Sequence, residues 1–193
     1  MGSSSRLNWV NWPNTITLSR VGLGLLCLPL LVSTDRNALL LGFALMITAE
    51  LTDLLDGVVA RATKSITPAG KLLDPMADSM YRLTIFALFV QLAWMPAWMM
   101  CIFIIRDIGV AYLRMVAQQS GIPVASRFSG KAKAVAQGAA QLFVVGAVGL
   151  GLDNLLPWRF PALALAAAVT LYSLADYAFA MLNAPAQRTN AKA

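Results

Sequence analysis

Four aspartates lie close together in the sequence, within residues 53–78 of a very apolar chain. Asp53 and Asp56 are separated by three positions and Asp74 and Asp78 by four, so on helices each pair shares one face. Four carboxylates that converge in an apolar setting would repel one another strongly. Divalent cations between them remove that repulsion, and carboxylate oxygens are hard ligands that suit Mg²⁺ or Mn²⁺. The spacing therefore predicts a site for divalent metal ions.

Small residues and one arginine accompany the first aspartate pair. Gly57 and Ala60 fall on the same helical face as that pair, and their small size would let a ligand approach the helix closely. Arg61 adds a permanently charged fork of donors that suits phosphate. Thr67 and Gly70 lie in a predicted turn, TPAG, between the two pairs. Acid pairs, small residues and an arginine together indicate a metal-bridged pyrophosphate.

A solvated helix face is the alternative interpretation for any one aspartate pair. That alternative is weak here because carboxylates inside apolar segments are expensive and are functional by default. The whole pattern, D-x2-D-G-x2-A-R-x8-G-x3-D-x3-D, has a chance frequency on the order of one in 10¹⁰ per start position at average residue usage. We therefore interpret the stretch as a functional site.

This pattern resembles the signature of the CDP-alcohol phosphotransferase family at all eight of its positions. Members of that family join an alcohol to the phosphoryl group of a CDP-linked lipid and release CMP. The resemblance implies two Mg²⁺ or Mn²⁺ ions held by the four aspartates, with Asp78 also acting as the base. It implies nucleotide contacts around Gly57, Ala60 and Arg61, and it suggests a homodimer.

A second short pattern, P-N-x-x-T-x-x-R, lies at Pro13 to Arg20. It resembles a sequence common at the start of the family, which would place Asn14 and Thr17 near the lipid substrate. Capping by Asn14 and snorkelling by Arg20 explain the same residues about equally well. The residues predicted to contact the CDP-lipid are therefore Asn14, Thr17, Asp56, Gly57, Ala60, Arg61, Thr67 and Gly70.

The composition is that of a membrane protein. Of the 193 residues, 59% are hydrophobic and 12% are charged, against about 25% charged in soluble domains. This predicts one membrane-embedded domain, 1–193, in which residues 1–5, MGSSS, have the character of an expression remnant. The net charge of +6 suits anionic lipid head groups, and the lack of a basic run argues against nucleic acid. The chain has no histidine, which excludes histidine-based catalysis and histidine metal sites.

Six apolar segments predict an all-α bundle of six transmembrane helices, each able to cross about 30 Å of hydrocarbon. Trp9 and Trp12, among polar residues at 7–20, predict a short N-terminal interfacial helix. Pro75 either begins the third helix, with Asp74 as its cap, or kinks a continuous span. The predicted spans are Thr15–Val32, Asn37–Ala60, Leu73–Ala93, Pro96–Ala117, Ala132–Leu150 and Phe160–Leu182.

Lysines and arginines are distributed unequally between the two sides of the predicted bundle. One side holds only Arg36 and Arg159. Because cytoplasmic loops carry the basic excess, both termini and the aspartate site are predicted to face the cytoplasm, and we expect a bacterial inner membrane. The basic side holds Arg6, Arg20, Arg61, Lys64, Lys71, Arg127, Lys131, Lys133, Arg188 and Lys192.

Basic residues also gather in the predicted fourth span and in the loop after it. A charge in such an apolar run needs a partner or a water-filled cavity. Lys131 and Lys133 are too close in sequence to share a helix face, so we expect one of them to point to the cavity. Arg106 and Asp107 could instead form a self-contained pair, and positive-inside anchoring alone would explain about half of the basic residues. The residues predicted to hold the acceptor are Arg106, Arg114, Arg127, Lys131 and Lys133.

This region, an Arg-acid pair followed by S-x-G-K-x-K-x-x-x-Q, resembles the phosphatidylglycerophosphate synthase branch of the family. The resemblance implies transfer of the phosphatidyl group from CDP-diacylglycerol to glycerol 3-phosphate, with release of CMP. Asp107 replaces the glutamate common in that branch, and eukaryotic-type cardiolipin synthases often carry Arg-Asp. Phosphatidylglycerol, serine and an inositol phosphate therefore stay alternative acceptors. A cation transporter is a more distant alternative, against which the lack of a visible sequence repeat counts.

Two further charges, Glu50 and Arg82, lie near the aspartates. Glu50 lies three residues before Asp53 on the same helical face, so it either supports the metal site from behind or pairs with a basic residue. We favour structural roles for both Glu50 and Arg82. The last predicted span carries no pattern that indicates a role.

Overall fold

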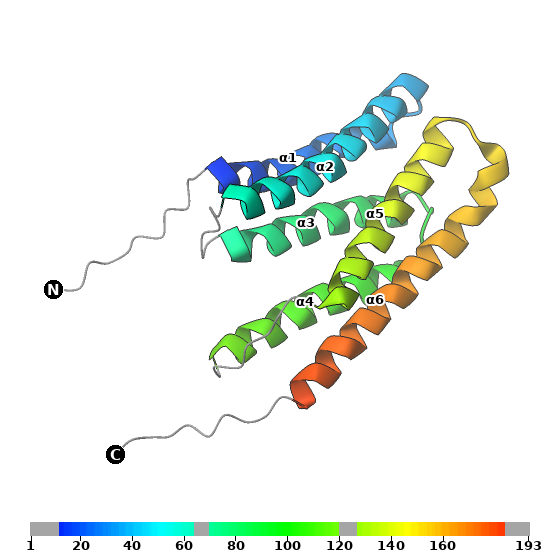
Figure 1. Ribbon diagram of the computed structural model, residues 1–193. Helices are drawn as coiled ribbons and strands as arrows, with labels where there is room; N and C mark the ends of the chain where they lie inside the picture. Colours follow the sequence, from blue (N-terminus) through cyan, green and yellow to red (C-terminus); the bar gives the residue numbers. More distant parts are fainter. Residues whose placement is uncertain (1–11, 64–69, 120–126, 184–193) are drawn as a thin grey trace, which may run out of the picture.

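The computed structural model describes residues 12–63, 70–119 and 127–183, and within these ranges it describes only the backbone of 12–18, 53–63, 70–74 and 118. This part of the chain is all-helical, as predicted (Figure 1). Its helices are α1 (Trp12–Val32), α2 (Arg36–Thr63), α3 (Gly70–Gln91), α4 (Ala97–Gln119), α5 (Phe128–Gly149), the short 3₁₀ helix η1 (Asp153–Trp158) and α6 (Arg159–Leu182).

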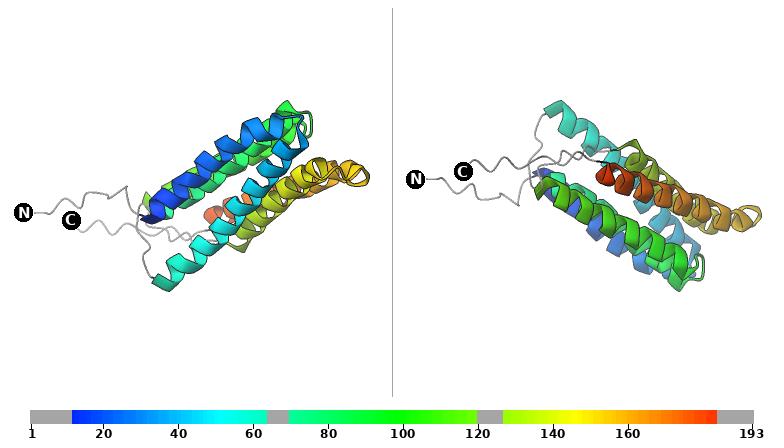
Figure 2. Two further views of the ribbon diagram at one scale, coloured as in Figure 1. Left: turned by 90° about the horizontal axis from the view of Figure 1, so that it is seen from above. Right: turned by 90° about the horizontal axis from the view of Figure 1, so that it is seen from below.

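The helices run up and down along a common bundle. The connections from α1 to α2, from α3 to α4 and from α5 to α6 lie at one end, whereas α2 ends and α3 begins at the other (Figure 1). α1 packs along α2 and α3, and α6 packs along α4 and α5. Figure 2 shows α5 and α6 side by side from above and from below. Contacts between α2 and α5 join the two groups of helices.

Short turns at the predicted breaks end the helices. Asp35 caps α2, because its carboxylate accepts a hydrogen bond from the N–H of Asn37 at 3.2 Å. After α3, Ala93 adopts a φ of 55°, and the N–H of Trp94 donates to the carbonyl of Phe89 at 2.8 Å. These local bonds satisfy backbone groups that the helix ends leave free.

The apolar core lies toward the end of the bundle that holds these turns. Phe86 and Phe103 stack with their ring centroids 4.3 Å apart, and Phe89 meets Phe86 edge-on at 5.9 Å. Val144 and Leu163 add α5 and α6 to the same fully buried cluster. The core therefore fixes the helices at one end and leaves the other end for buried polar side chains, which include Arg82, Arg106, Asp107 and Lys133.

Large apolar side chains also cover the outside of the bundle, which suits a lipid environment. In the described residues, two helical segments are long and apolar enough to cross a membrane, Phe128–Gly149 and Asp153–Leu182, and the apolar segment Ser19–Val32 is shorter. The side chains more than half exposed include Ile105, Ile108 and Tyr112 on α4 and Leu165, Tyr172 and Phe179 on α6.

Three helix boundaries differ from those that the sequence predicts. α1 is unbroken from Trp12, so no separate interfacial helix is present between Trp12 and Arg20, and the residues before Trp12 lie outside the description. α3 begins at Gly70 and continues through Pro75, which excludes Pro75 as its first residue. α5 begins at Phe128, four residues before the predicted start, and there Asp176 of α6 accepts a hydrogen bond from the hydroxyl of Ser129.

Candidate active site

A polar cavity of about 190 Å³ opens between α3, α4 and α5, toward the end of the bundle where α2 ends and α3 begins. Four of the five residues predicted to hold the acceptor line it, together with Asp78. The lining residues are Pro75, Asp78, Ser79, Arg106, Arg114, Gly130, Lys131, Lys133 and Ala134. The structure therefore brings the basic residues of α4 and α5 to the same place as one of the predicted metal ligands.

Asp78 is held by Arg82, one turn later on α3. The Nε of Arg82 donates to Oδ1 of Asp78 at 2.9 Å, and its two Nη atoms donate to the two carboxylate oxygens of Glu50 on α2 at 2.9 and 3.1 Å. Arg82 is 3% exposed, so the guanidinium end of these charge-assisted bonds is shielded from water. Arg82 thus ties α2 to α3 and leaves the second oxygen of Asp78 outside this pair. Glu50 pairs with a basic residue, one of its two predicted roles.

The backbone of α5 packs directly against this charged triad. A Cβ at Gly138 would lie 2.6 Å from Nη1 of Arg82 and 3.0 Å from each carboxylate oxygen of Glu50. Gln141, on the same face of α5, donates from Nε2 to the backbone carbonyl of Arg82 at 2.8 Å. The close packing of α2, α3 and α5 at this point therefore depends on a residue without a side chain at position 138.

Asp107 lies at the centre of a second buried cluster. Its carboxylate accepts a hydrogen bond from Nη1 of Arg106 at 3.0 Å, and Nζ of Lys133 lies 2.9 and 3.0 Å from its two oxygens. Nη2 of Arg106 also donates to the hydroxyl of Ser173 on α6 at 2.8 Å. Arg106 and Asp107 do pair, but the pair is not self-contained, because Lys133 and Ser173 share it.

Lys131 and Lys133 have different surroundings, as their spacing predicts. Lys133 is 2% exposed and is engaged by Asp107, whereas Lys131 is exposed at the cavity. Within the part of the chain that the structure describes, Lys131 forms no ion pair. Lys131 is therefore the lysine free to meet an incoming anion.

Arg127, the fifth residue predicted to hold the acceptor, does not line the cavity. Its Nε and Nη2 donate to the two carboxylate oxygens of Asp176 on α6, both at 2.6 Å, and this bonding raises the pKa of Arg127. Arg114 does line the cavity, and its Nη2 donates to the hydroxyl of Tyr177 on α6. The sequence assigned no role to α6, although Asp176 is a charge in an apolar span and could have been identified on that ground.

The other predicted metal ligands lie on the same two helices, in stretches where only the backbone is described. Asp53 and Asp56 are in the last three turns of α2, and Asp74 is in the second turn of α3. Both stretches lie at the cavity end of the bundle (Figure 1). Of the residues predicted to contact the CDP-lipid, Asn14 and Thr17 are near the start of α1, Gly57, Ala60 and Arg61 are near the end of α2, Gly70 begins α3, and Thr67 lies outside the described residues.

The chemistry of the available donors fits divalent ions. All four aspartates offer hard carboxylate oxygens, and Asp78 is partly accessible, with 22% of its side chain exposed. Among the described side chains, no three His, Cys, Asp or Glu residues converge on one point. The metal site therefore stays a prediction that depends on Asp78 and on the helix positions of the other three aspartates.

Comparison with known proteins shows which family the chain resembles. The family model described as CDP-alcohol phosphatidyltransferase matches residues 10–182, a range that covers all six α-helices. A Bacillus subtilis protein named CDP-diacylglycerol–glycerol-3-phosphate 3-phosphatidyltransferase is 32% identical over 93% of this chain and 98% of its own length. A Mycobacterium tuberculosis protein named probable phosphatidylglycerophosphate synthase is 31% identical over 74% of this chain and 69% of its own length. A Drosophila melanogaster protein named probable cardiolipin synthase (CMP-forming) is 34% identical over 64% of this chain and 38% of its own length.

Proposed function

The chain belongs to the CDP-alcohol phosphatidyltransferase family, and we propose that it transfers the phosphatidyl group of CDP-diacylglycerol to glycerol 3-phosphate and releases CMP. It is thus an enzyme of phospholipid biosynthesis, and the product lipid is phosphatidylglycerol phosphate. The names of the Bacillus and Mycobacterium relatives support this acceptor, and the residues of the cavity give it a physical basis.

The net charge around the cavity is the main observation that supports glycerol 3-phosphate as the acceptor. Among the described side chains, four basic groups and the carboxylate of Asp78 line it, and the buried carboxylate of Asp107 adjoins them, which leaves two positive charges unbalanced. A phosphate monoester carries about −1.5 to −2 charges at neutral pH, so glycerol 3-phosphate would balance the site. The six charged residues counted are Arg106, Arg114, Lys131, Lys133, Asp78 and Asp107.

We place the acceptor phosphate between Arg114 and Lys131. Lys133 and Arg106 already neutralise Asp107, so their first task is to stabilise the cavity wall. Nε of Arg114, like Nε of Arg106, is buried and has no hydrogen-bond partner in the described part of the protein. A buried donor without a partner is costly, and a phosphate oxygen would satisfy it.

Asp78 is the proposed base of the reaction. Arg82 holds one of its oxygens at 2.9 Å, so the carboxylate has a fixed orientation and can accept the proton of the acceptor hydroxyl with the other oxygen.

We further propose that the aspartates hold two Mg²⁺ or Mn²⁺ ions, whose chemistry when bound is to neutralise the pyrophosphate and the leaving CMP. The proposed metal ligands are Asp53, Asp56, Asp74 and Asp78, and the proposed CDP-lipid contacts are Asn14, Thr17, Asp56, Gly57, Ala60, Arg61, Thr67 and Gly70.

The proposed setting is a bacterial inner membrane that all six α-helices cross. The outward-facing apolar side chains and the two long apolar helices support this arrangement. The basic excess at the cavity end would place that end and both termini in the cytoplasm, where soluble glycerol 3-phosphate meets CDP-diacylglycerol. A homodimer is part of the same proposal and is suggested by the family.

Phosphatidylglycerol is the second candidate acceptor, as in a cardiolipin synthase. The Arg106–Asp107 pair and the similarity to the Drosophila relative favour it. Phosphatidylglycerol is a phosphodiester with a single negative charge, so it would leave one positive charge of the cavity unbalanced. The charge count therefore favours glycerol 3-phosphate.

A panel of acceptors tests the proposal directly. The purified protein in detergent is given CDP-diacylglycerol and Mg²⁺ with glycerol 3-phosphate, phosphatidylglycerol, serine or inositol phosphate, and the lipid product is identified by mass spectrometry. We expect phosphatidylglycerol phosphate from glycerol 3-phosphate, together with an equal amount of CMP. Cardiolipin from phosphatidylglycerol as the main product would contradict the proposal, and Asp78→Asn serves as the inactive control.

A further inference from the structure

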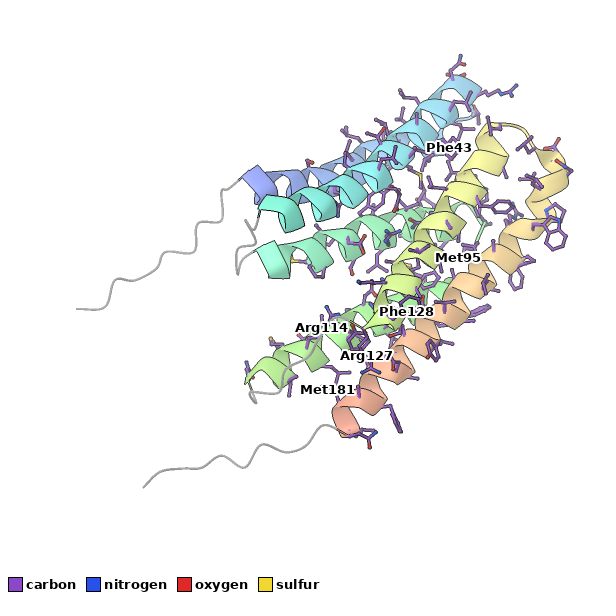
Figure 3. The ribbon with its side chains drawn as sticks, viewed as in Figure 1. Phe43, Met95, Arg114, Arg127, Phe128 and Met181 are labelled. Carbon is purple, nitrogen blue, oxygen red and sulfur yellow. The ribbon has the colours of Figure 1, made fainter. Side chains whose placement is uncertain are left out.

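The C-terminal half of α6 contacts both walls of the acceptor cavity. α6 packs closely along α4, which carries Arg114, and along α5, which carries Lys131, whereas the backbones of α4 and α5 make few contacts with each other. Figure 3 labels Arg114 on α4 and Arg127 at the start of α5, and both residues contact the same tyrosine of α6. The distance between the two basic walls is therefore set largely by α6.

Tyr177 of α6 lies between these walls. It is 1% exposed, and its hydroxyl accepts a hydrogen bond from Nη2 of Arg114 and another, at 3.2 Å, from the backbone N–H of Arg127. The guanidinium carbons of Arg114 and Arg106 lie 5.0 and 5.7 Å from the centre of its ring. A Cβ at Gly130 would lie 3.2 Å from the same hydroxyl, so the first turn of α5 packs directly onto it. One hydroxyl thus links an arginine of α4 to the backbone that begins α5.

Asp176, the preceding residue, holds the side chains of that first turn. Its carboxylate accepts two hydrogen bonds from the guanidinium of Arg127 at 2.6 Å and one from the hydroxyl of Ser129 at 2.5 Å. Arg127 is the N-cap residue of α5 and makes no local side-chain cap. Asp176 therefore holds two side chains of this turn from another helix. Lys131 and Lys133 follow on the next turn, so their positions depend on this contact.

We infer that Asp176 and Tyr177 are positioning residues of the acceptor site, which set the separation and orientation of Arg114 and Lys131 for the acceptor phosphate. The inference rests on the proposed function, since it takes that cavity as the site of the acceptor phosphate. Neither residue needs to touch the substrate: Tyr177 orients Arg114, and Asp176 fixes the turn before Lys131. The role for α6 is then to hold two basic walls at the spacing of one phosphate group.

The substitution Tyr177→Phe separates orientation from packing. It removes the hydroxyl that accepts from Arg114 and keeps the buried ring beneath both guanidinium groups. The net contribution of one such hydrogen bond corresponds to a factor of roughly five in a binding constant, so we expect about a fivefold rise in KM for glycerol 3-phosphate. The KM for CDP-diacylglycerol should stay unchanged. Tyr172→Phe is the matched control, since Tyr172 lies on the same helix but is 67% exposed.

A double-mutant cycle shows whether Tyr177 acts through Arg114. In an Arg114→Met background, Tyr177→Phe should cause no further rise in the acceptor KM. Asp176→Asn should raise the acceptor KM about tenfold, again with an unchanged donor KM, whereas Asp153→Asn on the exposed η1 helix should leave both constants unchanged. Equal rises in both constants for Tyr177→Phe, or additive effects in the cycle, would show a general structural role and overturn the inference.

Binding of inorganic phosphate, measured by calorimetry in the same detergent, separates failure of the inference from failure of the proposed function. If the wild-type protein binds phosphate and Tyr177→Phe weakens binding about fivefold, the inference holds even if glycerol 3-phosphate is not a substrate. If glycerol 3-phosphate is a substrate and both the phosphate affinity and the acceptor KM of Tyr177→Phe equal those of the wild type, the inference is wrong and the proposed function stands.

Discussion

Lys133 and Lys131 lie two positions apart on α5, yet their environments give them different tasks. Lys133 is buried with Asp107, and such a pair is balanced only while both charges are present. Lys131 is exposed at the cavity and forms no ion pair with any residue that the structure describes. The sequence predicted that the surroundings of the two lysines would differ, because residues two positions apart on a helix lie on different faces. It did not indicate which lysine would be buried, since Asp107 lies on another helix.

Lys133→Met should therefore destabilise the protein rather than only weaken substrate binding. The substitution leaves Asp107 buried with one cation fewer, and breaking a buried pair costs about 3–5 kcal/mol. We expect a lower thermal unfolding midpoint in detergent, with a large part of the loss restored in Lys133→Met/Asp107→Asn. An unchanged midpoint for the single variant would show that Lys133 is not the partner that Asp107 requires.

Gly138→Ala should disturb the other charged cluster. The added methyl group would lie 2.6 Å from Nη1 of Arg82 and 3.0 Å from the carboxylate oxygens of Glu50, so the guanidinium would have to shift and its bonds to Asp78 and Glu50 would be distorted. We expect kcat to fall at least tenfold, because the proposed base loses its fixed orientation. Gly22→Ala is the control, since a Cβ there meets nothing within 4 Å. A normal kcat for Gly138→Ala would show that the arrangement of Glu50, Arg82 and Asp78 does not affect catalysis.

The helices show where local sequence signals are sufficient and where they fail. The polar turn at 33–36 and the break at 94–96 are correctly predicted because residues of each turn make the bonds that end the helices there. The start of α5 is predicted four residues late, because Ser129 and Gly130 are typical of a loop. In the structure, Asp176 of α6 holds Ser129, and Gly130 packs against Tyr177. Long-range partners therefore decided the boundary that local signals could not.

The end of α2 and the start of α3 carry the proposed metal ligands, and two substitutions test them. Asp53→Asn or Asp74→Asn should abolish turnover and weaken Mn²⁺ binding while the protein still folds, because each removes a charged oxygen ligand from a site that needs several. Mn²⁺ binding is followed by electron paramagnetic resonance, and the thermal unfolding midpoint reports folding. Near-normal turnover of either variant at low Mg²⁺ would show that the metal assignment is wrong.

At the scale of the whole molecule, the interior of the described bundle is apolar toward one end and charged toward the other. The stacked phenylalanines lie at the first, and the clusters around Arg82 and Asp107 lie toward the second. The sequence predicted this polarity from the aspartate motif and from the basic residues. Asp176 could have been singled out as a charge in an apolar span, but its partners and the roles of Ser173 and Tyr177 become recognisable only when α4 and α5 are placed beside α6.

The orientation of the bundle in the membrane gives a prediction for the molecule as a whole. In a background without Cys27 and Cys101, we expect Asn183→Cys, beyond α6, to be labelled by a membrane-impermeant maleimide only from the cytoplasmic side. Ser33→Cys, in the turn between α1 and α2, should be labelled only from the other side. The reason is the basic excess at the cavity end. Labelling of both positions from the same side would contradict the proposed topology.

The most direct test of the central claim is the pair of Michaelis constants of Lys131→Met. If the cavity binds the acceptor phosphate, loss of one charge-assisted donor, worth roughly 1.5–3 kcal/mol, should raise the KM for glycerol 3-phosphate about tenfold or more. The KM for CDP-diacylglycerol should barely change, and Arg36→Met, at the opposite end of the bundle, should alter neither constant. An unchanged KM for glycerol 3-phosphate in Lys131→Met would contradict the account, because the basic cavity would then not be the acceptor site.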